Sequence, residues 1–254
     1  MRLTISETKS KTSKNNEQVK IGDTIMKKNI TITFSNQKGG VGKSTLCAMF
    51  ANYLAEKGVE NISILDCDRQ HSMLAKRQAD VQFLQAEKVP YELKSIEIDT
   101  LQAAAILMKS AKEMEGICMF DSPGNIYLQG MVPLLGYSDV IICPFQYEFN
   151  CLESTLMFLN VIGKIWLAYM KGRKKPKLIF VPNLVMKSRG TVAEIESWKK
   201  TDAALVQAGG IVTPPVYNRA DLSRYNTFGN TKQQAEIVKP AFDRIYDELL
   251  KLED

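Results

Sequence analysis

The chain has 254 residues, of which 45% are hydrophobic and 24% are charged, with 9 Pro and 15 Gly. These values exclude fibrous and largely disordered proteins, and the length suits one large α/β domain or two small ones. Five cysteines without a C-x-x-C pair and a single histidine, His71, argue against a disulfide framework, a zinc cage and a His-rich metal site. No apolar stretch reaches the roughly 18 uninterrupted residues that cross a bilayer, and no signal peptide is visible, so we expect a cytoplasmic protein.

Positive charge is concentrated at the N-terminus. The chain carries a formal net charge of +5, and residues 1–28 contain seven basic and three acidic residues, a net +4. Such a segment is typical of an arm that meets nucleic acid, and a solvated terminus has the same composition. We expect a basic, poorly ordered tail over residues 1–28 and one folded domain over residues 29–254.

From residue 29 onward, short apolar runs alternate with longer amphipathic ones. Because the runs are rich in Ile, Val, Leu and Phe on both faces, they predict a mostly parallel sheet covered by helices on both sides, the doubly wound α/β class. Ligands bind such sheets at the carboxyl ends of the strands. The predicted strands cover residues 29–35, 61–66, 91–98, 117–121, 140–144, 177–182 and 211–216. The predicted helices cover residues 44–57, 99–114, 150–169, 190–207 and 232–252.

A glycine-rich loop follows the first predicted strand directly, and a predicted helix follows the loop. Glycines let backbone N–H groups converge on phosphate oxygens, and the helix adds the positive end of its dipole. Lys43 supplies a mobile charge for the β and γ phosphates, and the Ser44 hydroxyl can bind Mg²⁺. The pattern K-G-G-x-G-K-[ST] therefore predicts a site for a nucleoside triphosphate. The residues expected to hold it are Lys38, Gly39, Gly40, Val41, Gly42, Lys43, Ser44 and Thr45.

This loop departs from the ordinary pattern G-x-x-x-x-G-K-[ST], because Gln37 stands at the first Gly and Lys38 follows it. Two lysines so close cannot easily share one phosphate pocket, so Lys38 is expected to reach a phosphate bound by another subunit. The segment S-N-Q-K-G-G-V-G-K-S-T resembles the deviant Walker A motif of the ParA/MinD group of ATPases. The resemblance implies a P-loop NTPase fold of the SIMIBI type, a homodimer that shares ATP, and catalytic roles for Lys38 and Lys43.

Two carboxylates lie one residue apart at the end of the second predicted strand, in Asp66-Cys67-Asp68-Arg69-Gln70. The segment resembles the D-x-D-P-Q segment of partition ATPases, with Arg69 where their Pro stands. Such a pair can serve Mg²⁺ and the attacking water together. We assign Asp68 to the water and Asp66 to the metal side. A helix-capping or solvated pair would show the same spacing.

Later strand ends supply the remaining candidates. The strand predicted over residues 117–121 delivers Asp121, in the form of a Walker B carboxylate that holds a Mg²⁺-bound water. Together with Ser44 and Asp66, it completes the expected metal site. The resemblance also implies that Asn183 reads the adenine edge and that the loop at Pro215 packs against the ring. Asn and Pro also end strands for purely local reasons.

The partner is less clearly marked than the nucleotide. A MinD-type protein ends in a basic amphipathic helix on anionic lipid, but residues 239–254 hold three basic and five acidic residues. We therefore expect no membrane partner, and we expect this segment to seal the sheet. Cys118 and Cys143 lie inside predicted strands, which argues against an iron–sulfur ATPase. Amide-forming and biotin-pathway synthetases share the loop, and residue types leave them open.

Basic residues favour non-specific DNA binding by an ATP-bound dimer. Residues 171–177 carry five positive charges in seven positions, and a dimer doubles every contact with phosphate. A solvated loop explains the same charges. The candidate DNA contacts are Lys171, Arg173, Lys174, Lys175, Arg219 and Arg224.

The resemblance thus implies a ParA-like ATPase that holds DNA while ATP-bound, associates with the nucleoid, and segregates a plasmid or mobile element. Its hydrolysis would be slow and stimulated by a ParB-like adaptor. The stretch D-C-D-R-Q-H-S-M also resembles ParA-like proteins of Bacteroidetes conjugative elements. The alternative is an ATP-controlled switch that recruits a conjugation apparatus or another protein complex, with little catalytic role.

Overall fold

The computed structural model describes residues 19–21, 24–26, 29–169, 172–186, 188 and 190–252. Lys171 and most of the expected tail lie outside the described residues. Within the tail, β1 (Val19–Ile21) and β2 (Thr24–Met26) pair as a small antiparallel sheet. The boundary between residues 28 and 29 stays a prediction.

The described residues contain a seven-stranded parallel sheet in the order β5-β4-β6-β3-β7-β8-β9. The predicted parallel α/β class is therefore confirmed. All the expected strands form, although those predicted over residues 91–98 and 211–216 are shorter than their apolar runs. The strands are β3 (Ile30–Phe34), β4 (Ile62–Asp66), β5 (Glu92–Ser95), β6 (Ile117–Asp121), β7 (Val140–Phe145), β8 (Lys177–Pro182) and β9 (Ile211–Val212).

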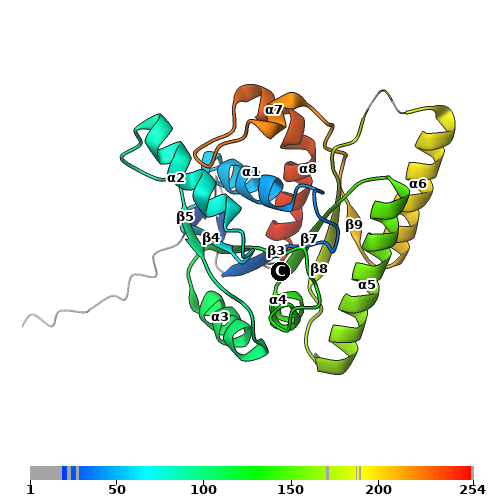
Figure 1. Cartoon of the computed structure of the whole chain (residues 1–254), viewed down its shortest axis with the longest axis horizontal. Coiled ribbons are helices and arrows are strands. Elements are labelled where there is room, and N and C mark those ends of the chain that lie inside the picture. The colour runs from blue at the N-terminus through cyan, green and yellow to red at the C-terminus, as the bar shows by residue number, and fades with distance from the viewer. Residues whose placement is uncertain are drawn as a thin grey trace, which may run out of the picture.

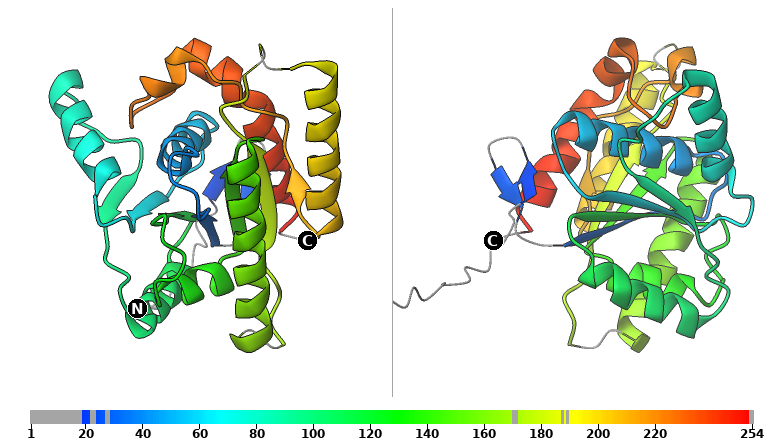
Figure 2. Two further views of the ribbon diagram at one scale, coloured as in Figure 1. Left: turned by 45° about the vertical axis from the view of Figure 1, so that its right-hand side comes forward. Right: turned by 90° about the vertical axis from the view of Figure 1, so that its left-hand side faces the viewer.

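Helices cover both faces of this sheet (Figure 1, Figure 2). One face carries α1 (Lys43–Glu56) and α8 (Lys232–Leu250), and the other carries α3 (Leu101–Glu113), α4 (Met131–Tyr137) and α5 (Phe149–Tyr169). Each face of the sheet packs a separate hydrophobic core against its helices, and successive side chains of a strand point alternately into the two cores. In β3, Ile30, Ile32 and Phe34 pack toward α1 and α8. The intervening Thr31 and Thr33 bond to Asp139 and Ser138 instead.

Three further helices complete the described fold. Both α2 (Ser72–Leu84) and α7 (Ala220–Ser223) lie on the side of α1, and neither was predicted. The helix predicted over residues 190–207 forms as α6 (Val192–Gln207) and packs against β9 (Figure 1). The second helix was missed because its buried face is polar, with Arg77 and Asp80 buried beside Met73. The fourth was missed because it has only seven residues and contains Pro133 and Gly136.

The polar face of α2 forms a buried clasp with the segment 225–230. The Arg77 guanidinium donates to Thr227 Oγ1 at 2.8 Å, to the Thr227 carbonyl at 3.0 Å and to the Tyr91 carbonyl at 3.0 Å. Asp80 accepts from the backbone N–H of Thr227 at 2.8 Å and pairs with Lys76. Both buried charges are thus hydrogen-bonded, and Asp80 is also ion-paired with Lys76, which offsets the cost of burying them.

The C-terminal helix seals the sheet as expected. Phe242, Ile245 and Leu249 are fully buried, and the Phe242 ring packs edge-on against Phe50 of α1 with centroids 5.1 Å apart. Thr231 and Gln234 form a capping box that fixes where the helix begins. By length and composition, α5 is the one helix in the described ranges that could span a membrane. Phe158, Ile162 and Ile165 nevertheless anchor it in the core.

Candidate functional site

The polar strand ends meet at the carboxyl edge of the sheet. The phosphate loop follows β3, the central strand, and β6 and β7 lie on either side of it. The register pairs Asp121 with both Phe34 and Asp66, so the three strands end at one level. This is the edge where doubly wound sheets bind their ligands.

Glycines shape the phosphate loop. Gly40 and Gly42 have φ of +75° and +92°, which other residues adopt only with strain. A Cβ at Gly40 would meet nothing within 4 Å, so this part of the loop faces open space. A Cβ at Gly42 would lie 2.3 Å from Asn183 Nδ2, so Gly42 also permits a close approach. The backbone therefore has the open, curled form that a phosphate cradle needs.

The Lys43 ammonium lies between this loop and the loop after β6. Its Nζ is 3.5 Å from the Lys38 carbonyl, and a Cβ at Gly124 would lie 3.8 Å from it. Burial lowers the pKa of Lys43, and the nearby Asp121 and Asp68 carboxylates oppose that shift. Because burial disfavours the charged form of Lys43, an anion bound in the open loop would stabilise its ammonium.

Lys38 combines a fixed backbone with a free side chain. Its N–H donates to Asn36 Oδ1 at 3.2 Å, and Asn36 is anchored in turn by donating to the Pro144 carbonyl at 2.8 Å and to Thr155 Oγ1 at 3.2 Å. The Lys38 side chain is exposed, and its ammonium has no hydrogen bond or ion pair with the described residues. The position can therefore present a cation outward from a rigid base.

Asp121 is a buried carboxylate without a partner. It is fully buried, and neither oxygen accepts a hydrogen bond from any described residue. Burial raises the pKa of Asp121 to about 7, while Ser44 and Lys43 lie close enough to oppose the shift. Orphaned oxygens beside a hydroxyl suit a hard cation or its bound water.

The two carboxylates after β4 have different surroundings. Asp66 is fully buried and accepts from three backbone N–H groups, those of Asp68 at 3.2 Å, Met73 at 3.2 Å and Leu74 at 3.3 Å. It thereby ties β4 to the start of α2, as the helix-capping alternative expected. Asp68 is half-buried and accepts from Gln70 N–H at 3.0 Å. Its charge raises the pKa of both Lys43 and Asp121, so Asp68 lies near these two residues.

Arg69, which stands in place of a Pro, has a defined contact. Its guanidinium pairs with Asp99, with Nη2 at 2.7 Å and Nε at 3.2 Å from the same oxygen. Because Asp99 lies between β5 and α3, the pair links the loop after β4 to the loop after β5. Both side chains are exposed, so the link contributes little to stability.

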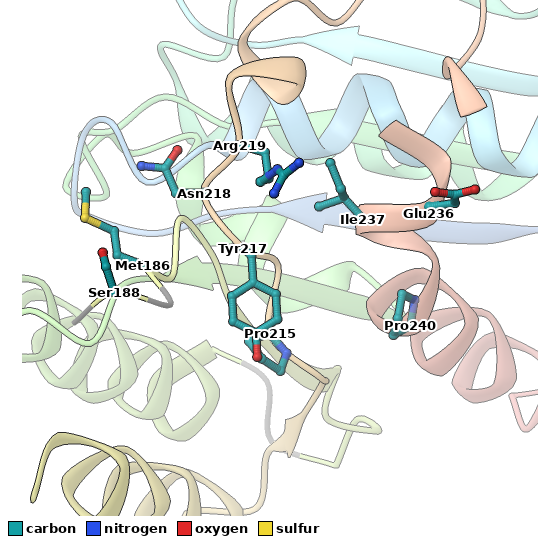
Figure 3. A pocket seen from close by; sticks show the side chains of 9 residues that line it. All are labelled: Met186, Ser188, Pro215, Tyr217, Asn218, Arg219, Glu236, Ile237 and Pro240. Atoms are coloured by element: carbon teal, nitrogen blue, oxygen red, sulfur yellow. The ribbon is translucent and has the colours of Figure 1, made fainter. Parts of the chain in front are cut away.

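A pocket of about 650 Å³ adjoins the carboxyl edge (Figure 3). Its size falls in the range of cofactor and nucleotide pockets. Met186 and Ser188 approach it from the loop after β8, and α8 forms another wall. The residues that line it are Met186, Ser188, Pro215, Tyr217, Asn218, Arg219, Glu236, Ile237 and Pro240. Pro215 lies in this lining, and its part in binding the base stays a prediction.

Asn183 lies at the base of the phosphate loop. Its Nδ2 donates to the Val41 carbonyl at 2.7 Å, and its buried Oδ1 accepts nothing from the described residues. Asn183 therefore braces β8 against the loop. The one group it leaves for another partner is Oδ1, and its part in reading adenine stays a prediction.

Sequence reasoning missed several residues that shape the site. Asn36 positions Lys38, Gln146 Nε2 lies 3.5 Å from the Gly40 carbonyl, and the Tyr225 hydroxyl contacts Thr45. Gln146 follows β7 directly, so the strand-end rule that found Asp66 and Asp121 could have found it. Tyr225 lies in a loop without a motif, and no sequence signal identified it.

The expected DNA contacts do not form one surface. Arg219 and Arg224 flank α7, and Arg219 lines the pocket that also contains Pro215. Arg173, Lys174 and Lys175 precede β8, at the amino edge of the sheet. Figure 1 shows α7 at the top of the view and the end of α5, which leads to these residues, at the bottom. Lys171 lies outside the described residues.

Two further observations concern clusters of metal-binding side chains and the cysteines in the described part of the chain. No group of three or more His, Cys, Asp or Glu there could hold a metal ion. All five cysteines are free and buried. Burial raises the pKa of Cys118 to about 11, which keeps that thiol protonated at neutral pH.

A phosphate loop on the central strand of a parallel sheet defines a P-loop nucleotide-binding protein. The family model of the CobQ/CobB/MinD/ParA nucleotide binding domain matches residues 32–231. The chain belongs to this family, as the ParA/MinD resemblance of its loops implied. No curated protein sequence matches the chain significantly.

Solved structures share the fold at low sequence identity. McdA from Cyanothece in complex with ATP is 12% identical with a TM-score of 0.66, covering 87% of this chain and 96% of that one. A putative plasmid partition protein from Borrelia burgdorferi bound to AMPPNP is 18% identical with a TM-score of 0.63, and the match covers 88% of this chain and 99% of that one. Cobyrinic acid a,c-diamide synthase from Mycobacterium smegmatis with an ATP analog and magnesium is 19% identical with a TM-score of 0.62, and the match covers 88% of this chain and 94% of that one. These likenesses establish the fold.

Proposed function

We propose that the protein is a ParA-like partition ATPase that dimerises around ATP. The observation that carries the proposal is Lys38, a free cation on a backbone fixed by Asn36, at the rim of the phosphate loop. A lysine that served its own subunit's phosphates would be expected to turn inward, as Lys43 does. The exposed ammonium suits a phosphate held by a second copy of the chain.

The site fits ATP and Mg²⁺. The open loop at Gly39 and Gly40 and the ammonium of Lys43 would hold the phosphates, and Ser44 and Asp121 would hold the metal or its water. Bound Mg²⁺ supplies positive charge to the β and γ phosphates. The neighbours crystallised with ATP, AMPPNP, or an ATP analog and magnesium support this assignment.

The chain's own residues then divide the work of hydrolysis. Asp68 faces the cradle and would orient the attacking water, while Asp66 holds the loop that carries it. Asp66 is committed to three backbone N–H groups, so any role at the metal would be through water. Lys38 from the partner would neutralise charge that develops on the phosphates. Hydrolysis would then require the dimer.

Two further roles complete the proposal. The base would occupy the pocket at Pro215, with Asn183 Oδ1 as a potential acceptor. The ATP-bound dimer would hold DNA through exposed cations on each subunit, and a DNA-bound ParB-like adaptor would stimulate release. The structural similarity to a putative plasmid partition protein supports a role in segregating a plasmid or mobile element.

The deciding experiment measures mass and DNA binding of the full chain together. We expect light scattering to show a monomer without nucleotide and a dimer with AMPPNP and Mg²⁺. Fluorescence anisotropy of a random 30-base-pair duplex should show tighter binding in the dimer and weakening with salt. A monomer that persists with AMPPNP, or DNA affinity indifferent to nucleotide, would reject the proposal.

An exposed apolar stripe on α5 favours a second candidate, the ATP-controlled recruitment switch. Phe149, Leu156 and Leu167 are 73%, 60% and 75% exposed, far more than a helix that only packs on the sheet needs. Affinity purification of cross-linked complexes with and without ATP would distinguish the candidates. DNA supports partition, and a conjugation protein captured only with ATP supports the switch.

A further inference from the structure

A second pocket, of about 360 Å³, lies at the amino edge of the sheet. It is formed where β3 begins, where α4 leads into β7, and where the loop after α5 leads into β8. Its lining holds Lys112, Arg173, Lys174, Lys175 and Lys177, with Asp139 as the one carboxylate. The nucleotide site is at the opposite ends of the same strands.

Two of these cations are already neutralised. Lys112 pairs with Asp139 at 2.5 Å, and Lys177 pairs with Glu248 at 2.9 Å. Asp139 also accepts from Thr31 N–H and Oγ1, both at 2.8 Å, so it is committed to the fold. These two pairs therefore build the pocket wall and leave its remaining charge to the other three residues.

The other three cations have no such partner. Arg173, Lys174 and Lys175 are exposed, and none forms an ion pair with a carboxylate among the described residues. Arg173 lies over the Tyr137 ring at 4.6 Å, and Lys175 Nζ lies 5.5 Å from the Trp166 ring centre. These contacts restrict the two side chains without neutralising them.

We propose that this pocket binds phosphate groups of a nucleic-acid backbone. The inference rests on the proposed function, because it assigns the site through which the ATPase holds DNA. Three cations at one recess supply charge for one or two adjacent phosphates, which are contacts that position a duplex without reading its sequence. Binding there is non-specific and salt-dependent.

The lining suits a phosphate backbone better than a lipid surface. Its large apolar residues are Ile30, which is buried, and Leu252 and Tyr137, which are half-buried. A membrane site would present exposed apolar side chains among its cations. Residues 1–28, which carry a net +4, lead directly into Asn29 in this lining.

The position of the pocket determines how ATP controls it. Because it lies at the amino edge, a nucleotide at the phosphate loop cannot touch it, and each subunit carries one complete pocket. Its affinity in the monomer is therefore independent of ATP. Dimerisation around ATP adds a second complete pocket to the same particle.

The test compares three double variants of equal charge change in the full chain. Arg173→Ala/Lys175→Ala removes the pocket cations, Arg219→Ala/Arg224→Ala removes those beside α7, and Lys199→Ala/Lys200→Ala on α6 is the matched control. Anisotropy with a 30-base-pair duplex is measured without nucleotide, from 50 to 200 mM salt. Arg173→Lys, which keeps the charge, tests for rescue.

We expect the pocket variant to bind DNA at least about tenfold more weakly at 0.1 M salt, with a salt slope smaller by about 2. The control should stay within about twofold of the unaltered chain. Unchanged affinity in the pocket variant, or an equal loss in the control, would overturn the inference. So would binding to phosphatidylglycerol vesicles in place of DNA.

Failure of the inference and failure of the proposed function are separable. If AMPPNP still drives dimerisation and DNA retention while the pocket variant binds normally, only the assignment of the pocket is wrong. If the pocket variant loses affinity but AMPPNP produces no dimer, the pocket stands and the partition cycle fails.

Discussion

The two edges of the sheet treat charge in opposite ways. At the carboxyl edge, the Asp121 carboxylate is fully buried and Lys43 is partly buried, whereas Lys38 at the rim is exposed. At the amino edge, Arg173, Lys174 and Lys175 remain exposed. Buried charges act strongly over a short range and require exact placement, whereas exposed ones act weakly and tolerate variation. The comparison agrees with the two proposals, in which hydrolysis takes place at the carboxyl edge and phosphate groups of DNA bind at the amino edge.

The largest expected effect separates Lys38 from the other cations. Lys38→Ala should lower ATP turnover about 10³-fold, as loss of a charge supplied in trans does in other phosphoryl-transfer enzymes. Light scattering with AMPPNP should then show only monomer. Binding of a fluorescent ATP analogue to the monomer should change by less than about threefold. A variant that dimerises normally would show that Lys38 does not cross the interface.

The next effect tests whether Asp68 acts in chemistry or only in the loop. Asp68→Ala should lower turnover about 100-fold, because the attacking water loses its orienting carboxylate. Dimerisation with ATP should persist, so the dimer accumulates and DNA retention lengthens. Asp99→Ala, which releases Arg69 in a neighbouring loop, is the control and should alter turnover little. Equal losses in both variants would favour a structural role.

A stability measurement tests the orphaned carboxylate. Because the pKa of Asp121 is about 7 in the fold against an ordinary 3.8, the native state binds a proton more tightly than the unfolded chain. The free energy of unfolding therefore falls as the pH rises from about 4 to about 7. Asp121→Asn should stabilise the nucleotide-free protein by up to about 4 kcal/mol at pH 8, and by less at lower pH. Urea denaturation in EDTA measures this, and a difference independent of pH would contradict it.

The smallest effect asks whether the two edges are coupled through α8. This helix lines the pocket at Pro215 with Ile237, and its Glu248 pairs with Lys177 at the other edge. Thr231→Ala removes the N-cap and should cost about 1 kcal/mol of stability, while Thr231→Ser should not. ATP and DNA affinities should change by less than about twofold. A larger change in either would reveal coupling through the helix.

Much of the fold could be predicted from the sequence because apolar runs and strand-end motifs coincide. The strands were found because both faces are buried, and the phosphate loop because its glycines leave few alternatives. The helix α2 was not found, because a clasp between Arg77 and Thr227 replaces the apolar stripe that periodicity detects.

Site residues could be predicted where they belong to a local sequence motif, and not where their position depends on contacts between distant parts of the chain. Asp121 and Lys43 could be placed because each belongs to a local motif at a strand end. The braced conformation of Asn183 could not, because it depends on a contact with Val41, 142 positions away in the chain. The separation of Arg219 from Arg173 likewise arises from topology, since β8 and β9 run between them. Spacing in the sequence carries no such information.

The Arg77 clasp joins three regions into a ring. It holds α2, which begins after the Asp68 loop, to the segment 225–230, and Tyr225 in that segment contacts Thr45 beside the phosphate loop. A shift of the Asp68 loop therefore has a short mechanical route to α7, which precedes Tyr225. Loosening this clasp would let the loop that carries Asp68 move independently of the segment 225–230.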